Sequence, residues 1–158
     1  MARPPESVWD YPRPPRVEFC GRRVRIVHGG ETIAESERAL RVLETSSPPT
    51  IYVPLEDVRA ELLEEAGGHH TVCEWKGRAS YFHLDGAGER AEHAAFHYPE
   101  PREGFEQLLG HVSFYPGRVE AAYLDDERVT PQAGSFYAGW ITAEIEGPFK
   151  GEPGTEGW

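Results

Sequence analysis

The strongest constraint on the fold is a succession of short segments in which apolar and polar residues alternate. Six of them are rich in β-branched or aromatic residues and are separated by turn residues; they cover residues 16–20, 23–27, 31–36, 50–54, 78–84 and 118–124. Alternation with a period of two places every second side chain on the same face of a β-strand. The sequence therefore predicts a mainly β domain built from small antiparallel sheets.

Two segments break this period and predict short helices. In residues 54–68, the side chains of Val58, Leu62 and Leu63 would share one face of a helix whose first turn is acidic. Residues 103–112 also carry apolar side chains at helical spacing. The predicted fold class is therefore α+β, mainly β, with one or two short helices.

Length and charge exclude several classes of protein. A chain of 158 residues can bury a core of its own and needs neither disulfides nor a metal ion to fold. Its net charge of −11 repels polyanions, so we expect no binding to nucleic acid. No stretch reaches the about 18 apolar residues of a membrane span, and residues 1–15 hold no apolar export signal. We expect a cytoplasmic protein that does not bind membranes.

The cysteine content predicts free thiols. Cys20 and Cys73 are the two cysteines of the chain, which is too few for a zinc ribbon or a disulfide framework. The histidines are dispersed along the sequence and complete no metal site with them. We therefore expect a reducing compartment and no bound zinc.

The two ends of the chain differ in composition from its middle. Residues 1–16 hold five prolines, which favour an extended arm. Residues 129–158 form an extension that is rich in glycine and proline. We expect both segments to lie against a central domain of residues 17–128, with Trp9 and Tyr11 buried where the first arm makes contact.

Five segments, in their order and spacing, resemble one protein family. They read "GETIAESERALRVLE", "YVPLEDVRAELL", "HHTVCEWKGRASYF", "FHYPEP" and "VSFYPGRVEAAY". The most specific part is the pattern T-x-C-x-x-K-G-x-A-x-Y, which begins at Thr71 and ends at Tyr81. Over about residues 17–128 the chain is similar to the domain of unknown function family 427, for which no activity is agreed.

This resemblance implies a β-tent-like fold, in which two small antiparallel sheets lean together. Other β-tent domains are held by a zinc ribbon with four cysteines, which this chain lacks, and some bind small molecules between their sheets. Many family members place proline after the cysteine of the pattern, where this chain has Glu74. The resemblance therefore implies a ligand pocket between the sheets and no zinc ribbon.

The pattern also supplies the candidate binding residues. We expect a pocket rim formed by His70, Thr71, Cys73, Trp75, Lys76 and Tyr81. Lys76 precedes Gly77 in a predicted tight turn and could meet a carboxylate or phosphate; the alternative is a salt bridge to Glu44 or Glu74. The leading hypothesis is a small-molecule-binding module, which would act as a sensor or accessory protein.

Aromatic residues could complete such a pocket. Trp75, Tyr81, Phe96, Tyr98 and Trp140 could form a box for a flat or cationic ligand. The alternative is that these side chains simply belong to the hydrophobic core, which is the more frequent role of buried aromatic residues.

A second hypothesis is an enzyme that acts on a small anionic substrate. Cys73 would be its nucleophile if a nearby cation stabilised the thiolate, with Lys76 holding the substrate. Glu44 is a further catalytic candidate, provided that a cation compensates its burial. The alternative for Cys73 is a small packing residue, because His70 would point to the opposite strand face. Nucleotidyl transfer is weakly supported, since no phosphate-binding turn precedes the acidic pair Asp125–Asp126.

A third hypothesis is non-covalent haem binding through histidine, which has been attributed to some relatives. The candidate axial ligands are His69, His70, His97 and His111. No C-x-x-C-H attachment pattern is present. The sequence is also compatible with a homodimer, and it leaves the identity of the ligand open.

Overall fold

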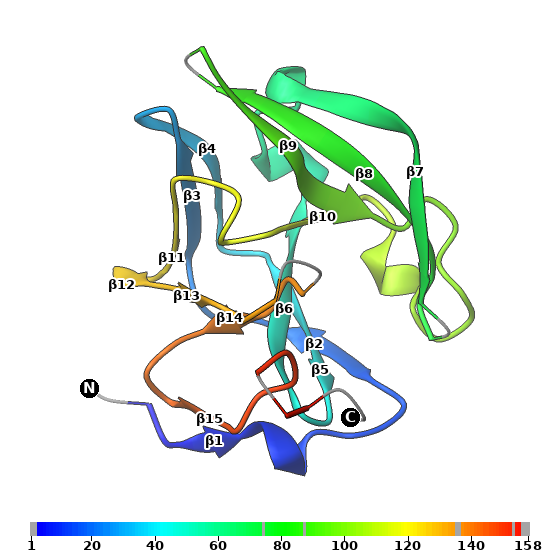
Figure 1. Cartoon of the computed structure of the whole chain (residues 1–158), viewed down its shortest axis with the longest axis vertical. Helices are drawn as coiled ribbons and strands as arrows, with labels where there is room; N and C mark the ends of the chain where they lie inside the picture. The colour runs from blue at the N-terminus through cyan, green and yellow to red at the C-terminus, as the bar shows by residue number, and fades with distance from the viewer. Residues whose placement is uncertain (1–2, 74, 87, 135–136, 153, 156–158) are drawn as a thin grey trace.

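The computed structural model describes residues 3–73, 75–86, 88–134, 137–152 and 154–155. It is mostly β, and its largest unit is a seven-stranded antiparallel sheet (Figure 1). The strands of this sheet lie in the order β2 (Arg16–Phe19), β5 (Leu40–Glu44), β6 (Ser47–Pro54), β10 (His111–Phe114), β9 (Glu89–His97), β8 (Gly77–Gly86) and β7 (Leu63–Cys73). The predicted mainly β fold class with antiparallel sheets is confirmed.

Three smaller sheets accompany the large one. A four-stranded antiparallel sheet has the order β12 (Glu127–Arg128), β11 (Ala121–Leu124), β3 (Val24–His28) and β4 (Glu31–Ser36). Two further pairs join β13 (Thr130–Pro131) to β14 (Trp140–Ile141), antiparallel, and β1 (Glu6–Ser7) to β15 (Ile145–Glu146), parallel. Each of the six alternating segments of the sequence overlaps a strand of one of the two larger sheets.

The helical segments are single 3₁₀ turns. They are η1 (Val8–Asp10), η2 (Leu55–Asp57), η3 (Ala60–Leu62) and η4 (Glu106–Leu108). The prediction of a helix over residues 54–68 is wrong, because Leu63 already begins β7 and pairs with Leu84 of β8. Val58 still reaches the core, but from an extended backbone that bridges to Ala34. Pairing with neighbouring strands has overridden the local helical spacing.

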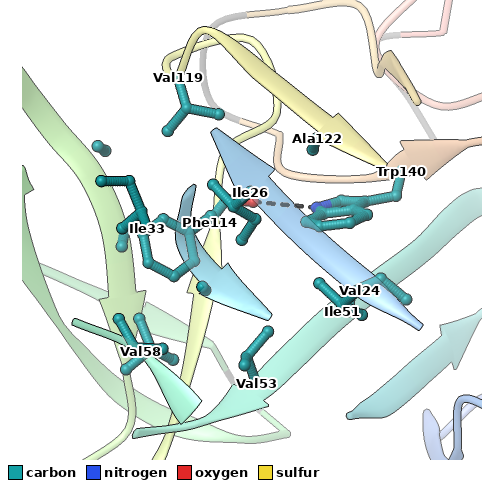
Figure 2. Close-up of a cluster of buried hydrophobic side chains, with 14 of the residues drawn as sticks. Val24, Ile26, Ile33, Ile51, Val53, Val58, Phe114, Val119, Ala122 and Trp140 are labelled. Carbon is teal, nitrogen blue, oxygen red and sulfur yellow. Dashed lines mark hydrogen bonds between the residues drawn. The ribbon is translucent and has the colours of Figure 1, made fainter. Parts of the chain in front are cut away.

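The main core fills the space between the two larger sheets. Val24 and Ile26 of β3 face Ile51 and Val53 of β6 across this space, and all four are buried (Figure 2). Trp140 closes the core from the side, and its indole N–H donates a hydrogen bond to the Phe114 carbonyl at 3.0 Å (Figure 2).

Both ends of the chain lie against the domain, and β1 runs beside β15 (Figure 1). Val8 and Tyr11 are buried with Leu43 and Ile145 in a separate cluster. The expectation for Trp9 is wrong: its side chain remains 43% exposed, and its indole N–H donates to the Pro148 carbonyl at 3.0 Å. The 3₁₀ turn of η1 directs Val8 inward in its place.

No helix in the part of the chain that the structure describes has the length and apolar composition needed to cross a membrane.

Candidate functional site

A cavity of about 250 Å³ lies on the face of the seven-stranded sheet that does not pack against the main core. Alternation along β6 explains this position. Ile51 and Val53 point into the main core, whereas Thr50 and Tyr52 point to the other face and line the cavity. One face of the sheet therefore packs in the main core, and the other face lines the cavity. The pocket expected between the sheets lies instead between the seven-stranded sheet and the C-terminal segment.

The C-terminal segment provides the outer wall of the pocket. Gln132, Tyr137, Ala138 and Lys150 line it. The buried Gln132 side chain accepts the Gly139 N–H at 3.1 Å and donates to the Lys150 carbonyl at 2.6 Å. These two bonds tie the C-terminal segment together at the outer wall. The sequence carries no motif that would have indicated this role.

The β7–β8 hairpin forms the wall that the sequence pattern predicted. In the strand register, Thr71 is opposite Ala79 and Cys73 is opposite Gly77. Thr71, Cys73, Ala79 and Tyr81 therefore share the face that lines the pocket. The Tyr81 hydroxyl lies 3.0 Å from that of Thr71, which fixes the ring against the strand.

Lys76 lies in the connection between the two hairpin strands, as predicted. Gly77 follows it with φ +115°, and a Cβ there would lie 3.2 Å from the Glu100 carbonyl oxygen. The backbone N–H of Lys76 donates to the Cys73 sulfur at 3.4 Å, and its carbonyl accepts the Arg102 N–H at 3.0 Å. The turn is thus held from both sides and directs the lysine side chain into the pocket lining.

The Lys76 side chain is a buried cation. The residue is only 9% exposed, and its ammonium lies 5.9 Å from the centre of the Tyr98 ring. Burial lowers the pKa of Lys76, but the charges that Tyr52, Cys73 and Glu44 carry when ionised raise it, and the net pKa is raised. The ammonium is therefore protonated at neutral pH.

Lys76 has no salt bridge within the described residues. Glu44 lines the same pocket, and its negative charge raises the pKa of Lys76. The Glu44 carboxylate does not lie within the salt-bridge distance of 4.0 Å from the Lys76 ammonium. The two arginines that precede Glu44 most closely in the sequence are engaged elsewhere: Arg41 pairs with Glu6 and Glu18, and Arg38 pairs with Glu56 and Asp57. The alternative partner Glu74 lies outside the described residues.

Tyr52 supplies a second buried polar group. Its hydroxyl is buried and has no hydrogen-bond partner among the described residues, although the rest of the side chain packs well. Burial raises the pKa of Tyr52, so the phenol keeps its proton at neutral pH. A buried hydroxyl without a partner costs free energy unless a ligand or water completes it. Sequence reasoning missed this residue, although the alternation of residues 50–54 already placed it beside Thr50.

An aromatic cluster forms the remaining walls, and it overlaps with the predicted box only in part. Tyr81, Phe96 and Tyr98 line the pocket, together with Tyr52 and Tyr115, which were not predicted. The rings of Phe96 and Tyr115 are 5.4 Å apart between their centres, and those of Tyr81 and Phe96 are 5.9 Å apart. Trp140 belongs to the main core instead.

Two of the predicted rim residues lie elsewhere. His70 is exposed, and its ring Nδ1 lies 3.3 Å from the Ser80 hydroxyl on the neighbouring strand. Trp75 is partly buried and lines a separate surface hollow beside Pro14 and Phe105. Neither lines the cavity, so the pocket brings together Glu44, Thr71, Cys73, Lys76 and Tyr81 from the predicted set.

The candidate haem ligands do not converge. His97 stacks on Phe82 at 4.7 Å, and burial lowers its pKa; His111 lies 3.1 Å from the Leu109 carbonyl. Like His70, neither lines the pocket, and the side chain of His69 lies outside the described residues. These imidazoles do not fit a haem site in the cavity.

The acidic pair Asp125–Asp126 forms salt bridges within the fold. Arg22 binds Asp125 at 3.0 Å and Arg23 binds Asp126 at 3.1 Å. Burial raises the pKa of Asp125, but the Arg23 N–H and the Arg22 side chain outweigh it and the net pKa is lowered. Across the described ranges, no group of three or more histidine, cysteine and acidic side chains could hold a metal ion.

A second cavity of about 250 Å³ is lined by Arg22, Arg41 and Cys20. Both guanidinium groups are already paired with carboxylates, Arg22 with Glu144 at 2.9 Å among others and Arg41 with Glu18. Paired charges of this kind hold the terminal segments to the domain. The pocket at Lys76 is therefore the better candidate for ligand binding.

Comparison with known families identifies a matching family. The family described as "domain of unknown function (DUF427)" matches residues 16–125, which is well over half of the chain. A comparison with curated proteins finds no match. The matched region contains the hairpin and the sheet face of the pocket, while its outer wall at Gln132 to Lys150 lies beyond it.

Proposed function

We propose that this chain, which belongs to the family described as domain of unknown function (DUF427), is a small-molecule-binding module. The observation that carries the proposal is the buried, protonated Lys76 on the wall of a cavity lined by aromatic rings. Such a combination of an apolar cavity with a few convergent polar groups is typical of ligand sites. The module would act as a sensor or accessory protein in the reducing cytoplasm, where Cys20 and Cys73 remain thiols.

The size of the cavity limits the ligand. Its volume of about 250 Å³ is close to the lower end of the range of about 300–1,000 Å³ that is usual for drug-sized ligands. A single-ring metabolite fits this volume better than a nucleotide does.

Cys73 allows the proposal to be tested by blocking the pocket. In a Cys20→Ala chain, maleimide labelling would place a bulky group at Cys73 on the pocket wall; in a Cys73→Ala chain it would label Cys20, beside the other cavity. A panel of charged and neutral single-ring compounds is then screened by thermal shift. We expect compounds that stabilise the unlabelled chain to lose their effect after Cys73 labelling and to keep it after Cys20 labelling. A panel without a stabilising compound, or one unaffected by the Cys73 label, contradicts the proposal.

A second candidate function is an enzyme in which Cys73 attacks the bound molecule. The observation that favours it is the position of the Cys73 thiol on the pocket wall beside the Lys76 turn, with the Lys76 N–H donating to its sulfur at 3.4 Å. Covalent catalysis also requires a base that activates the nucleophile. His70 does not supply it, because its ring points away toward Ser80. Binding without chemistry is therefore the preferred function.

A further inference from the structure

We infer that the pocket is selective for a small aromatic carboxylate, whose carboxylate group is held by the Lys76 ammonium and the Tyr52 hydroxyl. This inference rests on the proposed function and adds the chemical class of the ligand. It follows from a buried ammonium that no carboxylate of the described residues pairs with, from a buried hydroxyl without a hydrogen-bond partner among them, and from the aromatic walls around both.

The charge of the ligand follows from Lys76. A buried cation is costly unless an opposite charge compensates it. Within the described residues, no carboxylate lies at salt-bridge distance from this ammonium, and Glu44 is the only acidic side chain of the pocket lining. Lys150 adds a second cation at the outer wall, so the lining carries one more positive than negative charge. In a chain with a net charge of −11, this is a local site for an anion.

The second contact follows from Tyr52. Its hydroxyl is buried and lacks a partner, and it lies close enough to Lys76 for each group to influence the pKa of the other. Because the phenol stays protonated, it acts as a donor toward an oxygen atom of the ligand. An ammonium and a hydroxyl together match the two oxygens of one carboxylate.

The body of the ligand follows from the walls. Tyr81, Phe96, Tyr98 and Tyr115 present rings to the cavity, and Val42 adds an aliphatic surface. A flat apolar body makes offset-stacked or edge contacts with such rings. The hydroxyls of Tyr81 and Tyr115 lie 3.3 Å apart and form a hydrogen bond with each other. The ligand therefore needs no polar group opposite them. A ring bearing one carboxylate meets these conditions, whereas inorganic phosphate leaves the aromatic walls uncovered.

The test compares benzoate with its neutral analogue benzamide and with inorganic phosphate on the full chain. We expect benzoate to bind at least tenfold more tightly than benzamide, measured by titration calorimetry or protein-observed NMR. Lys76→Met should weaken benzoate binding by roughly tenfold to a hundredfold, the usual effect of losing a charged hydrogen bond. It should weaken benzamide binding much less, because the neutral amide carries no charge that the ammonium could compensate.

Tyr52→Phe is the matched variant that removes only the hydroxyl. It should weaken benzoate binding by roughly twofold to tenfold, while the melting temperature of the ligand-free chain stays the same or rises. If the Tyr52 hydroxyl were instead structural, Tyr52→Phe would lower the melting temperature of the ligand-free chain and leave benzoate binding unchanged. Likewise, a fall of roughly 10 °C in the melting temperature of ligand-free Lys76→Met would show that Lys76 is a structural ion-pair partner and would overturn the inference.

The remaining outcomes separate this inference from the proposed function. If benzamide binds as tightly as benzoate and the Cys73 label prevents both, the pocket binds small molecules but the inference of an anion is wrong. If phosphate binds as tightly as benzoate, the inference of an aromatic body is wrong. If none of the three binds at millimolar concentration, the inference is wrong, and the thermal-shift panel with the Cys73 label decides the proposed function separately.

Discussion

The hydroxyl groups of Thr71 and Tyr81 lie 3.0 Å apart across the β7–β8 hairpin, and the Tyr81 hydroxyl lies 3.3 Å from that of Tyr115. This chain of hydroxyls joins the hairpin to the segment that follows β10. It sets the orientation of two of the rings that line the pocket.

Tyr81→Phe should therefore lower the free energy of unfolding by about 1 kcal/mol, the usual net contribution of a hydrogen bond of this kind. Urea unfolding followed by tryptophan fluorescence measures the change. Tyr123→Phe is the control, because Tyr123 lies on β11 away from the pocket and contacts Arg25 through its ring. An equal loss in both variants would show that the Tyr81 network contributes nothing specific.

Two tryptophans should differ in their effect on stability. Trp140 is buried in the main core and donates to the Phe114 carbonyl, so Trp140→Ala should lower the free energy of unfolding by about 3–5 kcal/mol. Trp75 is only partly buried, and Trp75→Ala should cost about 1–2 kcal/mol. Benzoate binding should survive Trp75→Ala, since Trp75 does not line the pocket. Loss of binding in that variant would place the ligand elsewhere.

The pH dependence of benzoate binding reports on Lys76. Because its folded-state pKa is raised, the cation is fully present below the ordinary lysine range and is lost only as the pH rises through that higher value. The benzoate affinity should therefore stay constant between about pH 6 and pH 10, given an ordinary lysine pKa of about 10.4. Titration calorimetry in matched buffers measures it. A fall in affinity between pH 7 and pH 9 would identify a different group as the anion-binding residue.

Alkylation of the two thiols distinguishes the binding module from the enzyme. Burial raises the pKa of Cys20, so its thiolate is scarce and its reaction in the folded chain should be slow. We expect Cys73 to react no faster in the folded chain than in the chain unfolded in urea, as followed by mass spectrometry with iodoacetamide. A folded-state rate well above the unfolded rate, which disappears in Lys76→Met, would support the nucleophile and contradict the binding module as stated here.

The strands were predictable because their information is local. A period of two over residues 31–36 or 50–54 needs no knowledge of neighbouring strands, and both segments are strands in the structure. Helical spacing over residues 54–68 was equally local, yet there the hydrogen bonds between β7 and β8 decided the outcome. Intrinsic preference is a weak guide wherever a segment lies at the edge of a sheet that it can extend.

The candidate site was predictable to the extent that it lies on one hairpin. Thr71, Cys73, Lys76 and Tyr81 are close in sequence, and strand alternation with a tight turn is enough to bring them together. Alternation also predicted that His70 would point away from the Cys73 face, which the structure confirms. These four residues also belong to the pattern on which the resemblance to the family rests.

Residues a few positions apart were enough to predict strands in six segments, the hairpin turn at Gly77 and the positive charge of the residue before it. The burial of this charge, without a salt bridge among the described residues, is a property of the folded chain. That outcome depends on Tyr52 and Glu44 from distant strands and on the C-terminal wall at Lys150, which covers the sheet face. Burial and pairing are properties of contacts between segments far apart in the chain, and no local pattern of residues encodes which segments will meet.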